Sequence, residues 1–159
     1  RDSAGPARIG SPIGTFAQYG QPNAHTDSKA GSYHFQKYAD SNTDTLIVQT
    51  DLIDKGYSDV VDGVSVQADN AGWTPEEATT MVAKFLPTDA QYQKQVPLST
   101  GNGTDKIYYS ATLAKQLPAD EFTDASTNQI KAGTFDVQCL TNNGNVDSCN
   151  IQVGTQQAQ

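Results

Sequence analysis

The chain has 159 residues, a length typical of one domain with its own hydrophobic core. It carries 10 basic and 18 acidic residues, a formal net charge of −8, and both of its arginines, Arg1 and Arg8, stand at the start. Because phosphate binding needs clustered lysine and arginine, this composition argues against nucleic acids, nucleotides and anionic membranes as partners.

The first twelve residues predict a flexible lead-in. They contain Gly5-Pro6 and Ser11-Pro12, pairs that interrupt regular structure. The sequence shows no apolar stretch of the roughly 18 residues that a membrane span requires, and no signal peptide. We therefore expect the mature part of an exported bacterial protein, secreted or anchored at the cell surface, and a lipid tether upstream of Arg1 is one form of such an anchor. A cytosolic protein is the alternative.

The next part of the chain predicts a short helical turn and three strands. Thr15 can cap a turn that Gly20 ends. Apolar and polar residues then alternate over 32–38, 45–52 and 64–68, with turn residues at 40–44 and at Asp62-Gly63. This pattern is typical of an antiparallel meander with one face exposed to water.

The clearest predicted helix begins at Thr74. Thr74 is a strong N-cap, Pro75 suits the first helical position, and Glu77 completes a capping box. Apolar residues recur at helical spacing through Phe85, and the helix should end near Leu86-Pro87. We expect its apolar face to pack on the sheet.

The following residues carry weaker signals. Residues 87–104 read as a long loop, 107–109 as a short strand, and 120–132 as another loop. Ser110 can cap a second short helix between them.

The two cysteines lie in a predicted hairpin. Residues 135–139 and 149–153 alternate as strands, and the segment between them is rich in turn formers. Folding the chain about Gly144 places Cys139 opposite Cys149, Val137 opposite Ile151 and Phe135 opposite Val153. Directly opposed residues lie close to disulfide geometry, so we predict a Cys139–Cys149 bridge and a non-reducing compartment. Two reduced cysteines that pack as small apolar side chains are the alternative.

Together these elements predict one α+β domain over residues 13–154 with a polar tail at 155–159. The domain should contain an antiparallel sheet of about five or six strands, with one main amphipathic helix and one or two short helices packed on it.

Two short motifs suggest a family. The first is Ile13-Gly14 followed by Tyr19-Gly20-Gln21-Pro22, and the second is the Asp62-Gly63 turn that enters a strand. Together they resemble the small bacterial lipoprotein modules related to beta-lactamase-inhibitor protein and to outer-membrane assembly lipoproteins. The resemblance covers residues 13–68, and it implies short helices on one face of an antiparallel sheet and a function in binding other proteins.

Acidic residues cluster at 51–62, where Asp51, Asp54, Asp59 and Asp62 could offer oxygen ligands to a hard cation. Their spacing does not follow the EF-hand pattern, and we interpret the segment as a solvated acidic loop, leaving cation binding there open.

No motif predicts catalysis. His25 and His34 are the only histidines and lie in no metal-binding or catalytic pattern. Glu76 and Glu77 are explained by the helix start. The remaining acidic residues outside the 51–62 segment include Asp89, Asp105, Asp120, Glu121 and Asp124, and the sequence does not rank them. We therefore assign no catalytic, cofactor-binding or metal-binding residue.

Aromatic residues give the candidate binding surface. Tyrosine and tryptophan supply rigid contact area, and Tyr108-Tyr109 should place one ring on each face of a strand. Tyr57 and Trp73 complete this candidate surface, with core packing as the alternative for each of them.

The sequence leaves three functions open. The first is a non-catalytic extracytoplasmic binding or structural domain, acting as a monomer on another protein or a cell-surface component. The second is a secreted hydrolase in which loop aspartates converge in a pocket. The third is a ligand-carrying domain with an apolar cleft between sheet and helix.

Overall fold

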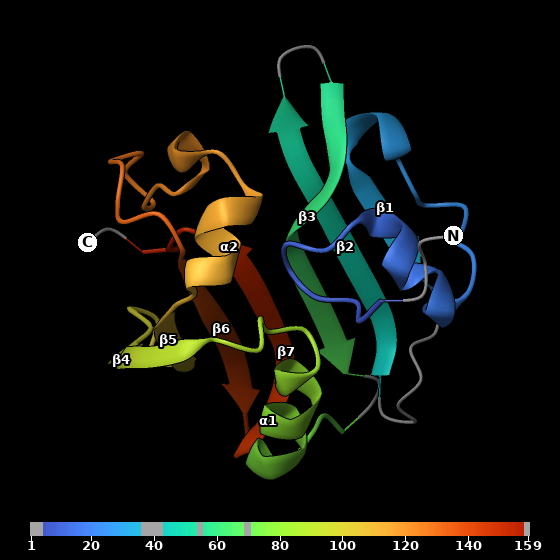
Figure 1. The fold of residues 1–159 in the computed structure, drawn as a ribbon. Helices are drawn as coiled ribbons and strands as arrows, with labels where there is room; N and C mark the ends of the chain where they lie inside the picture. Colours follow the sequence, from blue (N-terminus) through green and yellow to red (C-terminus); the bar gives the residue numbers. More distant parts are fainter. Residues whose placement is uncertain (1–4, 36–42, 54–55, 69–70, 158–159) are drawn as a thin grey trace.

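A seven-stranded antiparallel sheet forms the centre of the molecule, with the strand order β1-β2-β3-β7-β6-β5-β4 (Figure 1). The computed structural model describes residues 5–35, 43–53, 56–68 and 71–157. The strands are β1 (Ser32–Phe35), β2 (Thr43–Ile53), β3 (Gly56–Ala68), β4 (Gln91–Pro97), β5 (Gly103–Tyr109), β6 (Thr134–Asn142) and β7 (Asn145–Val153). The predicted α+β class is confirmed, and the sheet has more strands than the predicted five or six.

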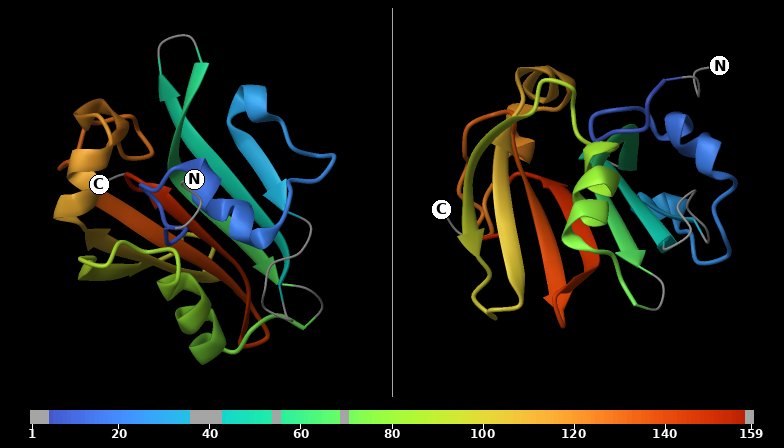
Figure 2. Two further views of the ribbon diagram at one scale, coloured as in Figure 1. Left: turned by 45° about the vertical axis from the view of Figure 1, so that its right-hand side comes forward. Right: turned by 90° about the horizontal axis from the view of Figure 1, so that it is seen from below.

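Short helices accompany the sheet. Within the described residues, two are α-helices, α1 (Pro75–Ala83) and α2 (Ala111–Gln116), and three are 3-10 helices, η2 (Ile13–Tyr19), η3 (Ser28–Ala30) and η4 (Ala119–Glu121). Figure 2 shows α1, α2 and η2 on the same side of the curved sheet. Buried side chains from α1, α2 and η2 join the core, among them Met81, Leu113 and Phe16.

Both predicted helix caps are present. The Thr74 hydroxyl accepts a hydrogen bond from the Glu77 backbone N–H at 3.1 Å, and the Glu77 carboxylate accepts one from the Thr74 N–H at 2.9 Å. The Ser110 hydroxyl accepts a bond from the Leu113 N–H at 3.0 Å. These bonds satisfy backbone donors that a helix start leaves without partners, so local sequence determines where α1 and α2 begin.

The β6–β7 hairpin confirms the predicted register. Cys139 pairs with Cys149, Val137 with Ile151 and Phe135 with Val153, and the two cysteines form a disulfide. Asn143 and Gly144 make the turn with φ values of 53° and 84°, the left-handed conformations that a two-residue hairpin turn requires.

The buried face of the sheet is continuous across its centre. Val64 of β3 pairs with Ile151 of β7, which pairs with Val137 of β6, and all three are buried. Successive residues of a strand point to opposite faces, so Asp136 and Asn150 lie on the other face. The buried residues on this face belong to the same core cluster as the buried residues of α1, α2 and η2.

The acidic segment differs from its prediction, because Asp62-Gly63 is not a turn. It lies within β3, where Gly63 pairs with both Gln49 of β2 and Gln152 of β7. The β2–β3 register shifts on either side of Thr50, so the strands absorb irregular residues as bulges. The valines around Asp62-Gly63 are apolar enough to continue a central strand, and this outweighs the local turn preference.

The predicted loop at 87–104 contains β4. This strand forms one edge of the sheet and pairs only with β5. Residues 91–95 are exposed and mostly polar, so β4 carries no alternating apolar pattern that the sequence could reveal.

Both ends of the described chain are packed. In the predicted lead-in, Ala7 and Ile9 are buried, the Ile9 N–H donates to the Phe85 carbonyl at 3.0 Å, and an Arg8 guanidinium nitrogen donates to the Leu86 carbonyl at 2.6 Å. In the predicted tail, Thr155 is buried. Apolar residues between the prolines anchor the first segment to the core. Parts of several predictions lie outside the described chain. These are residues 1–4 of the lead-in, the strand end at 36–38, most of the turn at 40–44, Asp54, and residues 158–159.

Candidate functional site

An apolar cleft of about 370 Å³ lies between α1 and strands β5 and β6. One apolar wall consists of Ala78 and Val82 of α1 and of Leu86, which follows the helix. The opposite wall consists of Tyr108, Val137 and Cys139 of the sheet. The volume and the apolar lining are typical of small-ligand sites.

The cleft exists because α1 presents small side chains to a wide sheet. Ala78, Thr79 and Ala83 line the helical wall and reach only a short way into the space. The strand that contacts α1 most is β7, while β6 and β5 continue beyond it and curve (Figure 2). The sheet face past β7 is therefore left partly uncovered.

Few polar groups line the cleft, and one is charged. Lys106 of β5 stands beside its cross-strand partner Gln95 of β4, and Thr104 follows on the same face of β5. Within the described chain, the Lys106 ammonium group has no hydrogen-bond or ion-pair partner. The cleft thus has long apolar walls and one cationic group on its β4–β5 side.

The four residues predicted as a binding surface do not share one face. Trp73 is fully buried in the core. Tyr108 is half-buried in the cleft, where its ring stacks on Phe135 at a centroid distance of 5.2 Å. Tyr109 points to the opposite face, with the Lys131 ammonium 4.2 Å from its ring centroid. Tyr57 is exposed on β3 and pairs with the exposed Leu52 of β2.

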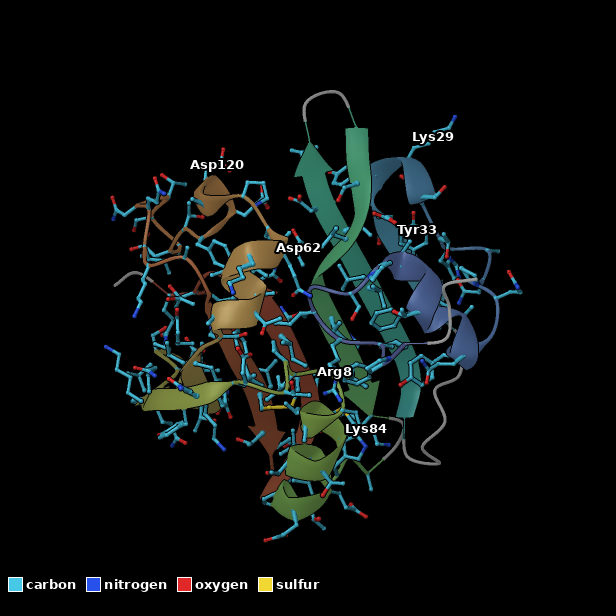
Figure 3. The ribbon with its side chains drawn as sticks, in the orientation of Figure 1. Arg8, Lys29, Tyr33, Asp62, Lys84 and Asp120 are labelled. Carbon is cyan, nitrogen blue, oxygen red and sulfur yellow. A yellow bond between two sulfur atoms is a disulfide. The ribbon has the colours of Figure 1, made fainter. Side chains whose placement is uncertain are left out.

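A second candidate site contains carboxylates. Asp51 of β2, Asp62 of β3 and Glu121 of η4 each place an oxygen within 4.8 Å of the others. Figure 3 shows Asp62 between β3 and α2, with Asp120 marking η4. The β2–β3 bulges and η4 bring the three together, and neither feature was predicted.

The environment of these carboxylates favours their protonated forms. Burial raises the pKa of Asp62 to about 6, and the nearby Asp51 adds to the shift. Burial also raises the pKa of Glu121 to about 8, helped by contact with Asp51 and by the charges of Asp62 and Asp120. Such groups can hold a proton near neutral pH or share a cation.

The converging carboxylates resemble the arrangement expected for a hydrolase, but the apolar cleft lies elsewhere. Its lining contains no aspartate or glutamate. The two features are therefore separate, and each needs its own explanation.

A buried pair, Asp105 of β5 and Asp136 of β6, lies on the outer face of the sheet under the C-terminal segment. Asp136 accepts bonds from the Gln156 backbone N–H at 2.7 Å and side-chain amide at 2.8 Å, and Asp105 accepts one from the Gln157 amide at 3.1 Å. Burial raises the pKa of Asp136 to about 8, and contact with Asp105 adds to this. These hydrogen bonds hold the C-terminal residues Gln156 and Gln157 against the outer face of the sheet.

Most of the remaining sequence candidates have structural partners. Asp89 accepts bonds from the Ser110 hydroxyl and the Thr112 N–H at the start of α2, and these bonds lower its pKa. Asp124 accepts bonds from the Ser126 and Asn128 N–H groups in its own turn. His34 lies on β1, 3.0 Å from the Ser32 hydroxyl, and His25 is exposed.

Comparison with family models, with curated proteins and with solved structures gives no match. In the described ranges, no helix has the length and apolar character needed to cross a membrane.

Proposed function

We propose that this chain is a non-catalytic binding domain that acts outside the cytosol and holds a small amphiphilic ligand in the cleft of α1, β5 and β6. The observation that carries the proposal is the cleft itself, an apolar space of about 370 Å³. Ligand sites of this kind combine apolar walls with a few placed polar groups.

The lining indicates the chemistry of the ligand. Apolar side chains from α1 and β6 suit a hydrocarbon chain, because removing apolar surface from water lowers the free energy. Lys106 suits a carboxylate or similar anionic head, because a cation beside an apolar wall binds its counter-ion more strongly than in bulk water. The proposed ligand class is therefore a short-chain amphiphile with one negative charge.

The disulfide supports a site of action outside the cytosol. Bridges such as Cys139–Cys149 persist in oxidising compartments and are rare where thiols are kept reduced. Cys139 also lines the cleft, so the bridge stabilises the β6–β7 wall next to the proposed ligand.

The proposal is tested by fluorescence titration of the intact, unreduced chain with N-phenyl-1-naphthylamine, followed by displacement with laurate. Thr79 and Thr80 are adjacent, exposed residues of α1, but only Thr79 lines the cleft. We expect Thr79→Phe to weaken probe binding by about tenfold, a loss of about 1.4 kcal/mol, because the ring occupies the cleft. Thr80→Phe should bind like the original chain.

The same assay tests whether Lys106 binds the anionic head of the ligand. Lys106→Met keeps the apolar stem and removes the charge, so it should retain the probe but lose the preference for laurate over dodecanol. Failure of the original chain to bind the probe, or equal weakening by Thr79→Phe and Thr80→Phe, would refute the cleft as the binding site.

A further inference from the structure

Three carboxylates from distant parts of the sequence meet at one end of the sheet. Asp51 and Asp62 come from paired strands β2 and β3, and Glu121 comes from η4. One oxygen of each lies within 4.8 Å of the others. This end of the sheet is separate from the apolar cleft, so an ion bound among the carboxylates would be independent of the proposed function.

The deepest of the three carries an unpaired oxygen. Asp51 is only 3 % exposed, and its Oδ1 has no hydrogen-bond partner. A buried polar atom without a partner is costly, and native structures normally satisfy such atoms with a donor, a water or an ion.

No cationic side chain compensates this group of carboxylates within the described ranges. The charges that act on Glu121 are those of Asp51, Asp62 and Asp120, all of them acidic. The charge that acts on Asp62 is that of Asp51. Like charges this close repel each other strongly when partly buried, so a cation placed among them would gain from all three.

The geometry points to a calcium site formed by Asp51, Asp62 and Glu121. Calcium prefers carboxylate, carbonyl and water oxygens at about 2.3–2.6 Å, so one ion can join oxygens up to about 5 Å apart. The smaller Mg²⁺ takes ligands at about 2.0–2.1 Å and needs a tighter set. Three protein carboxylates leave room for water ligands, which is typical of weak extracellular sites with dissociation constants of about 0.1–1 mM.

The bound ion would connect two parts of the fold. It would join the β2–β3 pair to η4 at the start of the 120–132 segment, which also contacts the rest of the molecule through Phe122, Ile130 and Lys131. Calcium should therefore raise the melting temperature of the whole chain.

The experiment measures the melting temperature of the intact chain at pH 7.5 in EDTA, in 10 mM CaCl₂, in 10 mM MgCl₂, and in NaCl of matched ionic strength. We expect calcium to raise the melting temperature by about 4 °C, and magnesium and NaCl to raise it less. In Asp62→Asn and Glu121→Gln the calcium effect should disappear, while stability in EDTA stays equal or rises because a repelling charge is gone.

Asp59→Asn is the matched control, since Asp59 is an exposed carboxylate of the same strand. It should keep the full calcium effect. The proposal is wrong if 10 mM CaCl₂ acts no more strongly than matched NaCl, or if Asp59→Asn and Asp62→Asn reduce the calcium effect equally.

Discussion

At the scale of single residues, the most unusual groups in the described chain are buried carboxylates that contact one another. Asp105 and Asp136 are both fully buried on adjacent strands. Two buried carboxylates in contact cannot both ionise at low cost, so one keeps its proton. Gln156 donates to both oxygens of Asp136 and Gln157 to Oδ2 of Asp105, while Oδ1 of Asp105 has no hydrogen-bond partner within the described chain.

This proton makes stability depend on pH. The pKa of Asp136 is about 8 in the folded chain and near its ordinary value of 3.8 when unfolded. Between these values the folded state binds the extra proton, so raising the pH lowers the free energy of unfolding, by at most about 1.4 kcal/mol per pH unit for one proton.

Asp136→Asn mimics the protonated acid, because its amide can donate to Asp105. We expect urea unfolding in EDTA to show a smaller loss of stability between pH 5 and pH 8 than in the original chain. Asp147→Asn, at an exposed position of β7, should leave the slope unchanged. An unchanged slope in Asp136→Asn would contradict the assignment of the proton to this pair.

The sequence could not predict the acidic site, although it located two of its members. Asp51 and Asp62 drew attention as neighbours in an acidic segment, which we interpreted as solvated. Their meeting depends on bulges in β2 and β3, and Glu121 arrives from another part of the chain. Side-chain convergence across such distances is a tertiary property that no local spacing encodes.

At the scale of elements, local signals predicted most of the structure. The Thr74 capping box and the Ser110 cap follow from residues three positions apart, and the β6–β7 register follows from one turn between neighbouring strands. The edge strand β4 was missed because its polar, exposed residues lack alternation. An apolar cleft between sheet and helix was one of the alternatives, but the sequence could not predict which strands line it, because that depends on how far β5 and β6 extend past α1.

The disulfide of the β6–β7 hairpin should contribute to stability. The Cys139–Cys149 bridge closes a short loop, and such a loop should stabilise the chain by about 2–3 kcal/mol. Replacing both cysteines by alanine should lower the free energy of urea unfolding by that amount. Dithiothreitol should have the same effect on the original chain and none on the variant. Equal stability of the two chains would show that the bridge contributes nothing.

At the scale of the whole molecule, two sets of strands meet at one seam. Strands β1, β2 and β3 form one antiparallel set, and β4 to β7 form the other. Only the β3–β7 pairing joins them within the described sheet, and buried valines and Cys149 line that seam. Ala7 and Ile9 near the start of the described chain pack in the core, and Gln156 near its end bonds to Asp136 on the outer face of the sheet. Both ends of the described chain are therefore attached to the sheet.

The seam between β3 and β7 also has a consequence for the rate of folding. Each set can form its hairpins between sequence neighbours, whereas pairing Val66 with Cys149 requires closure of a long stretch of chain. Contacts with such separation cost loop entropy before they return any stability, and they slow folding. Because closure of the seam limits the rate, we expect Val66→Ala to slow stopped-flow refolding in proportion to the stability that it loses. An unchanged refolding rate with faster unfolding would show instead that the seam closes after the rate-limiting step.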